Sequence, residues 1–172
     1  MAEPNDRLAA ERLAELLERY EGPLLRYAQR LVGGDLETAR DVVQDTFLRA
    51  MQQDAAALDG QAGPWLYAVC RNRALDIRRK ENRMTPTSET LLDARPSAGP
   101  PPGATLETAD DSRRLLAALD RLPVSQQEVV RLKFQAGLRY KEIAEVTGLS
   151  VTNVGFLLHT ALRTIREQCG ET

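Results

Sequence analysis

Cysteine and histidine are scarce in this chain, and their scarcity excludes several classes of site. The 172 residues include two cysteines, Cys70 and Cys169, and a single histidine, His159. Neither cysteine has a partner at metal-ligand spacing, so we expect no metal centre and no other cofactor. A glycine-rich phosphate loop and a Ser/His/Asp or Cys/His arrangement are also missing, so the chain is not expected to be an enzyme.

Long apolar runs are missing as well. No stretch approaches the roughly 18 apolar residues that a helix needs to cross a bilayer. The polar residues 1–12 lack the apolar segment of a secretion signal. The sequence therefore predicts a cytoplasmic protein without membrane insertion.

Aromatic residues make up only 5% of the chain, and helix-forming residues outnumber the β-branched and aromatic ones. This composition predicts an all-α fold. Residues 84–107 are rich in proline and glycine and almost free of large apolar residues, which indicates a flexible linker. We therefore expect two small helical domains, at residues 1–83 and 108–172.

Apolar residues recur every three or four positions on both sides of this linker, which predicts the helices. In the first domain they are expected at 6–32, as one helix or as two divided at Gly22-Pro23, at 36–52 after an N-cap at Asp35, and at 64–83. In the second domain they are expected at 108–121, at 125–135 with a capping box of Ser125 and Glu128, at 140–147, and at 151–168 after an N-cap at Ser150. Cys70 falls in an apolar stripe and is expected in the core.

Charge is unevenly distributed along the first domain. Residues 1–54 hold eleven acidic residues and seven arginines, whereas residues 71–83 hold six basic and two acidic residues. An acidic segment followed by a basic cluster indicates two different partners, and the basic cluster suits phosphate.

Residues 140–158 have the spacing of a helix-turn-helix. Ala144 is small where two helices would touch, Gly148 supplies a left-handed turn residue, and Val154 would be buried against the first helix with Ile143 and Leu149. Such a motif places its second helix in the DNA major groove. The alternative is an ordinary helical hairpin with a glycine turn.

The expected helix at 64–83 has an apolar stripe and a polar stripe. The apolar one contains Tyr67, Cys70, Ala74 and Ile77, and the polar one contains Asn72, Asp76, Arg79 and Arg83. Taken alone, this helix is either a solvated surface helix with a charged end or a DNA-binding helix whose cations meet phosphates.

Three segments, in order along the chain, resemble the extracytoplasmic-function (ECF) sigma factors of the sigma-70 family. The first two are DVVQDTFLRA at residues 41–50 and PWLYAVCRNRALDIRR at residues 64–79, which resemble region 2. The third is similar to region 4 and comprises LDRLP at 119–123, QQEVV at 126–130 and GLRYKEIA at 137–144.

This resemblance implies a promoter-specific transcription initiation factor that binds core RNA polymerase and promoter DNA. It implies contacts with the β′ clamp helices and the β flap of the polymerase, and an anti-sigma factor as an inhibitor. The residues expected on the β′ clamp helices are Asp41, Gln44, Asp45 and Leu48. Those expected at the −10 element are Trp65, Arg71, Asn72, Asp76, Arg78, Arg79, Lys80 and Arg83. Those expected at the −35 element are Tyr140, Ser150, Thr152, Asn153, Phe156, His159, Thr160 and Arg163.

The expected recognition helix departs from the family, since Gly155, Leu157 and Thr160 stand at usually basic positions. Phosphate attraction supplies much of DNA affinity, so this helix is expected to bind DNA weakly or through other side chains. For Gly155, drift at a tolerant position and close approach to DNA or a regulator are both open.

Two rival functions remain to be distinguished from that of a sigma factor. A dimeric helix-turn-helix regulator would explain residues 140–158 but not the segments at 41–50 and 64–79, and it would not co-purify with core polymerase. A helical adaptor that binds only protein would not melt promoter DNA in the presence of core enzyme.

Overall fold

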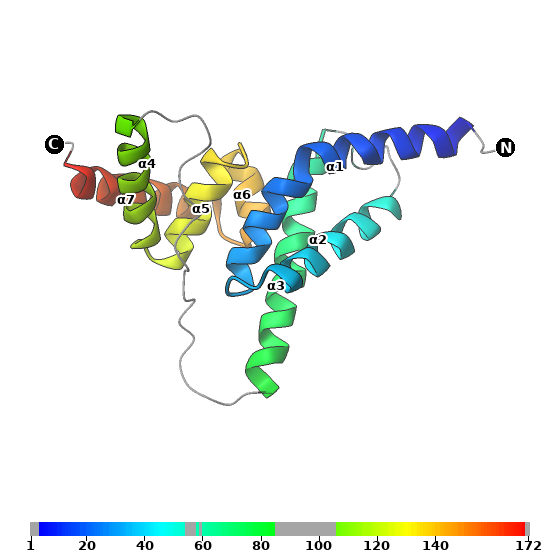
Figure 1. The fold of residues 1–172 in the computed structure, drawn as a ribbon, viewed down its shortest axis with the longest axis horizontal. Helices are drawn as coiled ribbons and strands as arrows, with labels where there is room; N and C mark the ends of the chain where they lie inside the picture. Colours follow the sequence, from blue (N-terminus) through cyan, green and yellow to red (C-terminus); the bar gives the residue numbers. More distant parts are fainter. Residues whose placement is uncertain (1–3, 54–57, 59, 85–105, 171–172) are drawn as a thin grey trace. The chain divides into compact units, whose positions relative to one another are not determined.

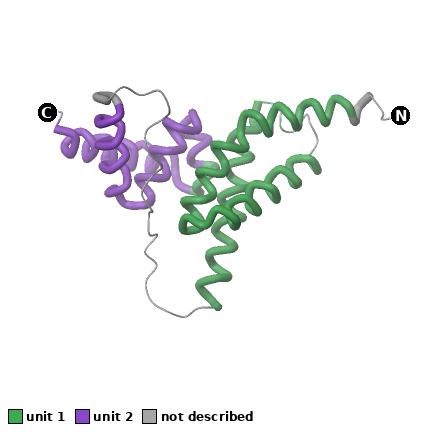
Figure 2. Tube along the Cα trace, viewed as in Figure 1, with its two compact units in different colours: residues 1–92, 145–148 green, residues 93–144, 149–172 purple. Residues whose placement is uncertain are grey.

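A computed structural model of the chain describes residues 4–53, 58, 60–84 and 106–170, and this part forms seven helices and no strand (Figure 1). The expected all-α class is confirmed. The helices are α1 Pro4–Leu31, α2 Leu36–Met51, α3 Ala62–Met84, α4 Leu106–Asp120, α5 Val124–Phe134, α6 Tyr140–Thr147 and α7 Val151–Cys169. Figure 2 divides the chain into two compact units, residues 1–92 with 145–148 and residues 93–144 with 149–172.

The predicted linker is described only at its ends, where Met84 closes α3 and Leu106 opens α4. Residues 85–105 lie outside the described residues. The helix expected from residue 108 therefore starts two residues earlier. None of the helices in the described ranges has the length and apolar character to cross a membrane.

The first unit is built from α1, α2 and α3, each of which packs on the other two. Apolar residues at three- and four-residue spacing turn one face of each helix inward. The fully buried apolar residues are Leu24, Ala28, Ala39, Val42, Leu66, Cys70 and Ala74. Across the core, the rings of Tyr27 and Tyr67 meet edge to face with their centroids 5.2 Å apart.

Cys70 lies in this core as predicted, with no exposed surface. Burial raises the pKa of its thiol to about 12, because the charged thiolate would lose its hydration there. Cys70 therefore remains a neutral packing residue.

Of the two alternatives at Gly22-Pro23, the division into two helices is wrong, since α1 continues through Pro23 without interruption. A proline inside a helix removes one backbone hydrogen bond and costs about 3 kcal/mol. Leu24, directly after Pro23, and Ala28, one turn further along, are both fully buried against the bundle. Tertiary packing of this turn offsets the local cost and keeps the two halves of α1 in one helix.

The predicted N-cap at Asp35 is confirmed. Its carboxylate accepts hydrogen bonds from the backbone N–H of Glu37 at 3.1 Å and from the Thr38 hydroxyl at 2.6 Å. These bonds, led by that of Thr38, stabilise the charged form and hold the pKa of Asp35 below its ordinary value. The cap starts α2 directly after the glycine turn that ends α1.

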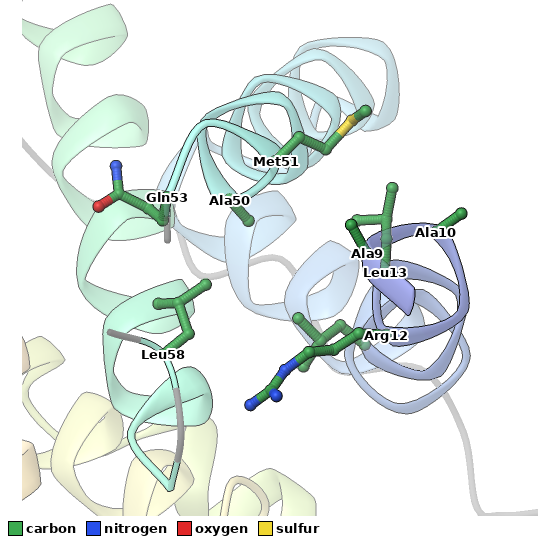
Figure 3. A pocket seen from close by; sticks show the side chains of 9 residues that line it. Ala9, Ala10, Arg12, Leu13, Ala50, Met51, Gln53 and Leu58 are labelled. Atoms are coloured by element: carbon green, nitrogen blue, oxygen red, sulfur yellow. The ribbon is translucent and has the colours of Figure 1, made fainter. Parts of the chain in front are cut away.

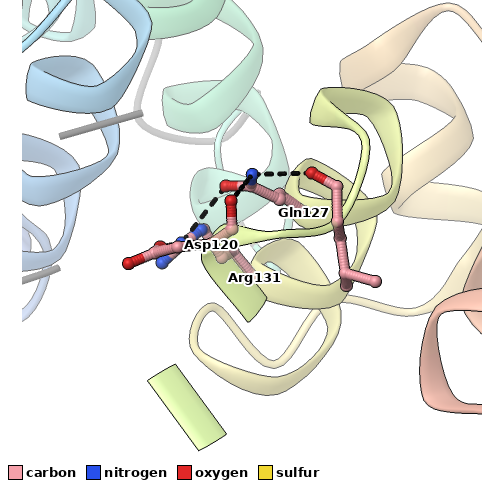
Figure 4. Close-up of polar contacts among 4 residues, drawn as sticks. Asp120, Gln127 and Arg131 are labelled. Carbon is pink, nitrogen blue, oxygen red and sulfur yellow. Dashed lines mark hydrogen bonds and ion pairs between the residues drawn. The ribbon is translucent and has the colours of Figure 1, made fainter. Parts of the chain in front are cut away.

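The second unit contains a buried polar cluster where α4 turns into α5 (Figure 4). Arg131 is only 5% exposed, and its Nη2 lies 3.0 Å from Oδ1 of Asp120 at the end of α4. The side-chain amide of Gln127 donates to the backbone carbonyls of Asp120 and Leu122, at 3.1 and 2.8 Å. Two side chains of α5 thereby bind the end of α4 and the turn that follows it.

The capping box expected at Ser125 and Glu128 is wrong. α5 begins one residue earlier, at Val124, with Pro123 as its N-cap and no side-chain cap bond. The Pro123 carbonyl accepts from the backbone N–H groups of Gln126 and Gln127, at 2.9 and 3.0 Å. Because Gln127 is already held by the preceding turn, the start of the helix is set by tertiary contacts and not by Ser125.

The buried ion pair gives a prediction about stability. Asp120→Ala leaves the Arg131 guanidinium buried without its carboxylate, so we expect the free energy of unfolding to fall by about 3 kcal/mol. Urea denaturation monitored by circular dichroism measures this free energy of unfolding.

Asp110→Ala is the matched control on the same helix. Asp110 pairs with Arg113 and Arg114 at the surface, at 3.7 and 3.1 Å. Exposed pairs of this kind contribute little, so the control should change stability by less than about 1 kcal/mol. Equal losses for the two variants would contradict the importance of the buried pair.

Candidate nucleic-acid and partner interfaces

The second helix of the predicted helix-turn-helix, α7, has two clearly different sides. Its buried side contains Val154, Leu158, Ala161 and Ile165, at spacings of four, three and four. Its exposed side contains Thr152, Phe156, His159 and Arg163, at the same spacings. Since the buried side is used by the core, the exposed side is the part of α7 that can meet a partner.

The turn before α7 has the local geometry that the sequence predicted. The Ser150 hydroxyl accepts from the backbone N–H of Asn153 at 3.1 Å, and Gly148 has a φ of +75°. Both Ile143 and Val154 are fully buried. Arg139 stands at the N-cap of α6, where its backbone N–H donates to the Glu142 carboxylate at 2.7 Å.

The remaining residues predicted for the −35 element lie around the exposed side. Asn153 and Ser150 are exposed, Thr160 is half-buried, and Tyr140 at the start of α6 is exposed. The Lys133 ammonium lies 5.5 Å from the Tyr140 ring centroid and donates to the Leu138 carbonyl at 3.4 Å. Tyr140 therefore brings a cation to the border of the α7 surface.

No contact within the described part of the chain requires glycine at position 155. A Cβ built on it would meet the nearest atom, Cε2 of Tyr140, at 3.6 Å, which is ordinary van der Waals contact. Its φ lies outside the left-handed region. Both explanations given by the sequence, drift at a tolerant position and close approach to DNA or a regulator, therefore stay open.

The basic end of α3 presents its polar stripe outward. Asn72, Asp76, Arg79, Lys80 and Arg83 are all exposed, and Arg79 pairs with Asp76 at 3.3 Å. Three further residues predicted for the −10 element are half-buried, namely Trp65, Arg71 and Arg78.

Arg78 differs from its neighbours because it turns back onto α1. Its Nη1 donates to the Leu31 carbonyl at the end of α1, at 3.5 Å, and lies 3.1 Å from the position of a Cβ on Gly33. Gly33 has a φ of +75°, where only glycine is unstrained. Arg78 thus binds the C-terminal end of α1, where cations are favoured by the helix dipole.

The residues of α2 that are predicted to contact the polymerase also differ in their exposure. Asp41, Gln44 and Leu48 are exposed, whereas Asp45 is half-buried. Its Oδ2 lies 3.2 Å from Nε of Arg49 and 3.3 Å from Nε of Arg73 on α3. These contacts are electrostatic, because neither meets hydrogen-bond geometry. Asp45 thus bridges α2 and α3 as well as facing outward.

The sequence did not predict the apolar pocket of about 300 Å³ beside the first half of α1 (Figure 3). It is lined by Ala9, Ala10, Arg12, Leu13 and Leu16 of α1, by Ala50, Met51 and Gln53 at the end of α2, and by Leu58. Met51 is 62% exposed, and Leu48 one turn earlier is 51% exposed. The available signal was the apolar stripe of α1, which begins well before its fully buried residues.

Each of the two units matches a known protein family. The chain matches Sigma-70 region 2 over residues 16–84 and Sigma-70, region 4 over residues 112–165. It is 31% identical over 170 residues to the ECF RNA polymerase sigma factor SigL of Mycobacterium tuberculosis, which covers 96% of this chain and 94% of SigL.

Two further proteins are similar. The ECF RNA polymerase sigma factor BldN of Streptomyces coelicolor is 33% identical over 159 residues, which are 91% of this chain and 60% of BldN. The sigma factor RpoE of Bartonella quintana, solved in complex with the anti-sigma factor NepR, has a TM-score of 0.64 at 24% identity. The match covers 90% of this chain and 94% of RpoE, and it shows a shared fold.

Gly155 inside α7 and Gly148 in the turn before α7 give opposite predictions for stability. Gly155→Ala should raise the free energy of unfolding by about 1 kcal/mol, because alanine is the better helix former and its methyl group fits beside Tyr140. Gly148→Ala should lower it by about 1 kcal/mol, because alanine is strained at a φ of +75°. Urea denaturation of both variants checks the signs, and a loss of stability for Gly155→Ala would contradict the packing described here.

Proposed function

The chain belongs to the sigma-70 family as an ECF RNA polymerase sigma factor, and from that premise we propose that it binds core RNA polymerase and directs promoter-specific transcription initiation. The observation that carries this function is the presence of region 2 and region 4 in order along one chain. The protein is then an initiation factor rather than an enzyme, and it acts in the cytoplasm with the polymerase. Its functional domains are residues 1–83 and 108–172, joined by residues 84–107.

The α2 surface is the proposed contact with the β′ clamp helices. Asp41 and Gln44 supply exposed polar groups beside Leu48, an apolar side chain that is half in solvent. An interface with a central apolar anchor and charged surroundings gains affinity from the first and orientation from the second. The half-buried Asp45 contributes charge to this surface and also fixes α2 against α3. The β flap is the proposed polymerase contact of the second domain.

The α3 surface is the proposed contact with the −10 element. Arg79, Lys80 and Arg83 are exposed at the end of the helix and suit phosphates. Asn72 is exposed two turns earlier, with Trp65 and Arg71 on the same helix, and suits an unpaired base. Arg78 acts differently in this proposal, because its contact with the Leu31 carbonyl positions α3 on α1.

The exposed side of α7, with Tyr140 and Ser150 beside it, is the proposed contact with the −35 element. The depleted charge of this helix means that the first domain and the polymerase supply most of the affinity for the promoter. An anti-sigma factor is a further proposed partner, since the similar RpoE was solved bound to one.

Asp41→Arg tests the polymerase contact. Because Asp41 is exposed and lies outside the Asp45 ion pairs, its reversal should leave the helical circular dichroism unchanged. Co-purification with core polymerase at fixed salt should fall on the order of tenfold. Glu18→Arg, at an exposed position of α1, makes the same charge change and should leave co-purification intact.

Asp45→Arg should abolish co-purification as well, but it also breaks the link to Arg73 and should lower the stability of the first unit. Undiminished binding by both α2 variants would refute the docking surface. A chain that does not bind core polymerase at all would instead be a dimeric regulator or a protein-binding adaptor.

Two adjacent arginines test the −10 contact. Arg79→Ala should reduce the slope of log affinity against log salt for open-complex formation by about one, because one phosphate contact is lost. Arg78→Ala should leave that slope unchanged and lower the free energy of unfolding, because its guanidinium binds backbone. Equal slope changes for the two variants would show that Arg78 also reaches phosphate.

A further inference from the structure

Phe156 occupies the centre of the exposed side of α7. Successive residues of a helix are rotated by about 100°, which puts Phe156 and Arg163 almost directly opposite the buried stripe of Val154, Leu158, Ala161 and Ile165. Its side chain is 65% exposed, more than that of any other large apolar residue in the described part of the second unit. As the sixth residue of α7, Phe156 lies in the N-terminal half of the helix, the part that contacts base edges in a helix-turn-helix.

The side chains around Phe156 are polar and carry little charge. Thr152 and His159 lie one turn before and after it on the same side, and Asn153 lies beside them. No lysine or arginine occurs from residue 151 to residue 162, and Arg163 is the first. Arg163 is itself 4.0 Å from Glu167.

These side chains can distinguish only some of the groups in the major groove. Guanine is usually recognised by arginine or lysine at its O6 and N7, and the first three turns of α7 have neither. Asparagine can bind adenine through N6 and N7, whereas phenylalanine and the methyl group of threonine can pack against the C5-methyl group of thymine. The surface of α7 therefore matches A·T base pairs.

A protein partner would require a different surface. The apolar neighbours of Phe156 along the chain, Val151 and Leu157, lie on opposite flanks of α7 by the rotation per residue. Phe156, with Tyr140 at the border and polar side chains between, is not part of a continuous apolar patch of the kind that marks a protein interface. The ring is, however, continuous with the proposed DNA-binding side of α7.

We propose that α7 recognises an A·T-containing −35 element in which Phe156 packs against the C5-methyl group of one thymine. This proposal rests on the function proposed above. The contact buries apolar surface on both partners, so it adds sequence preference where the missing basic residues add none. Asn153 is the proposed partner of an adenine beside that thymine.

Replacing thymine by deoxyuridine tests the contact directly, because this change removes the methyl group and keeps the pairing with adenine. The −35 element is first located by sequencing RNA 5′ ends after overexpression of the full chain. Each thymine of the element is then replaced singly, and the equilibrium binding of the full chain with core polymerase is measured at fixed salt. For one position we expect affinity to fall about fourfold, the effect of one methyl group leaving an apolar contact.

Phe156→Ala should bind the thymine and deoxyuridine promoters equally, because the partner of the methyl group is gone. Phe134→Ala is the matched control, since Phe134 is another exposed phenylalanine, 61% exposed, and lies at the end of α5 outside the recognition helix. It should keep the fourfold difference. Size-exclusion chromatography of the free chain adds a second measurement, in which a dimer that depends on Phe156 would assign the ring to self-association and overturn the proposal.

The outcomes separate this inference from the proposed function. A polymerase complex that initiates at defined promoters but is indifferent to every methyl group, or that keeps the difference in Phe156→Ala, refutes the thymine contact alone. A −35 element without A·T pairs refutes it as well. A chain that directs no initiation with core polymerase refutes the proposed function and this inference together.

Discussion

Each helix of this protein packs one of its sides into a small hydrophobic core, and the other properties of the molecule depend on that constraint. In α2 the core takes Ala39, Val42, Val43, Thr46, Phe47 and Ala50, and in α7 it takes Val154, Leu158, Ala161 and Ile165. Residues spaced three and four apart fill one side of a helix, so only the residues on the opposite side can contact a partner. Function in such a fold is confined to the sides that packing does not use.

Several arginines, two of them from the basic cluster at residues 71–83, hold the fold together. Arg131 is buried against Asp120, Arg73 joins α3 to Asp45 on α2, and Arg78 binds the backbone end of α1. A charged side chain that leaves water needs a partner, and these arginines find one on a different helix or in a turn. Of the basic cluster at residues 71–83, Arg79, Lys80 and Arg83 at the end of α3 stay exposed and suit phosphate in the proposed function.

In the proposed function, the two domains contribute unequally to promoter binding. In this proposal the exposed cations of α3 supply affinity for nucleic acid, whereas the exposed side of α7 discriminates between bases. Two weak contacts on one chain can still bind well, because the first contact raises the effective concentration of the second. A recognition helix with little charge also avoids tight binding to unrelated DNA.

The sequence by itself determined the features that depend on residues within about four positions of one another. These include the all-α class, the caps at Asp35 and Ser150, the left-handed turn at Gly148, and the buried and exposed sides of α7, because each follows from local hydrogen bonding and the helical repeat. Only the tertiary structure decided that α1 continues through Pro23, that α5 starts at Val124 without the Ser125 cap, and that Arg78 faces α1 while Arg79 faces solvent. These outcomes depend on contacts between different helices and the turns that join them, and the free energy of those contacts exceeds the local preference of a single proline or serine.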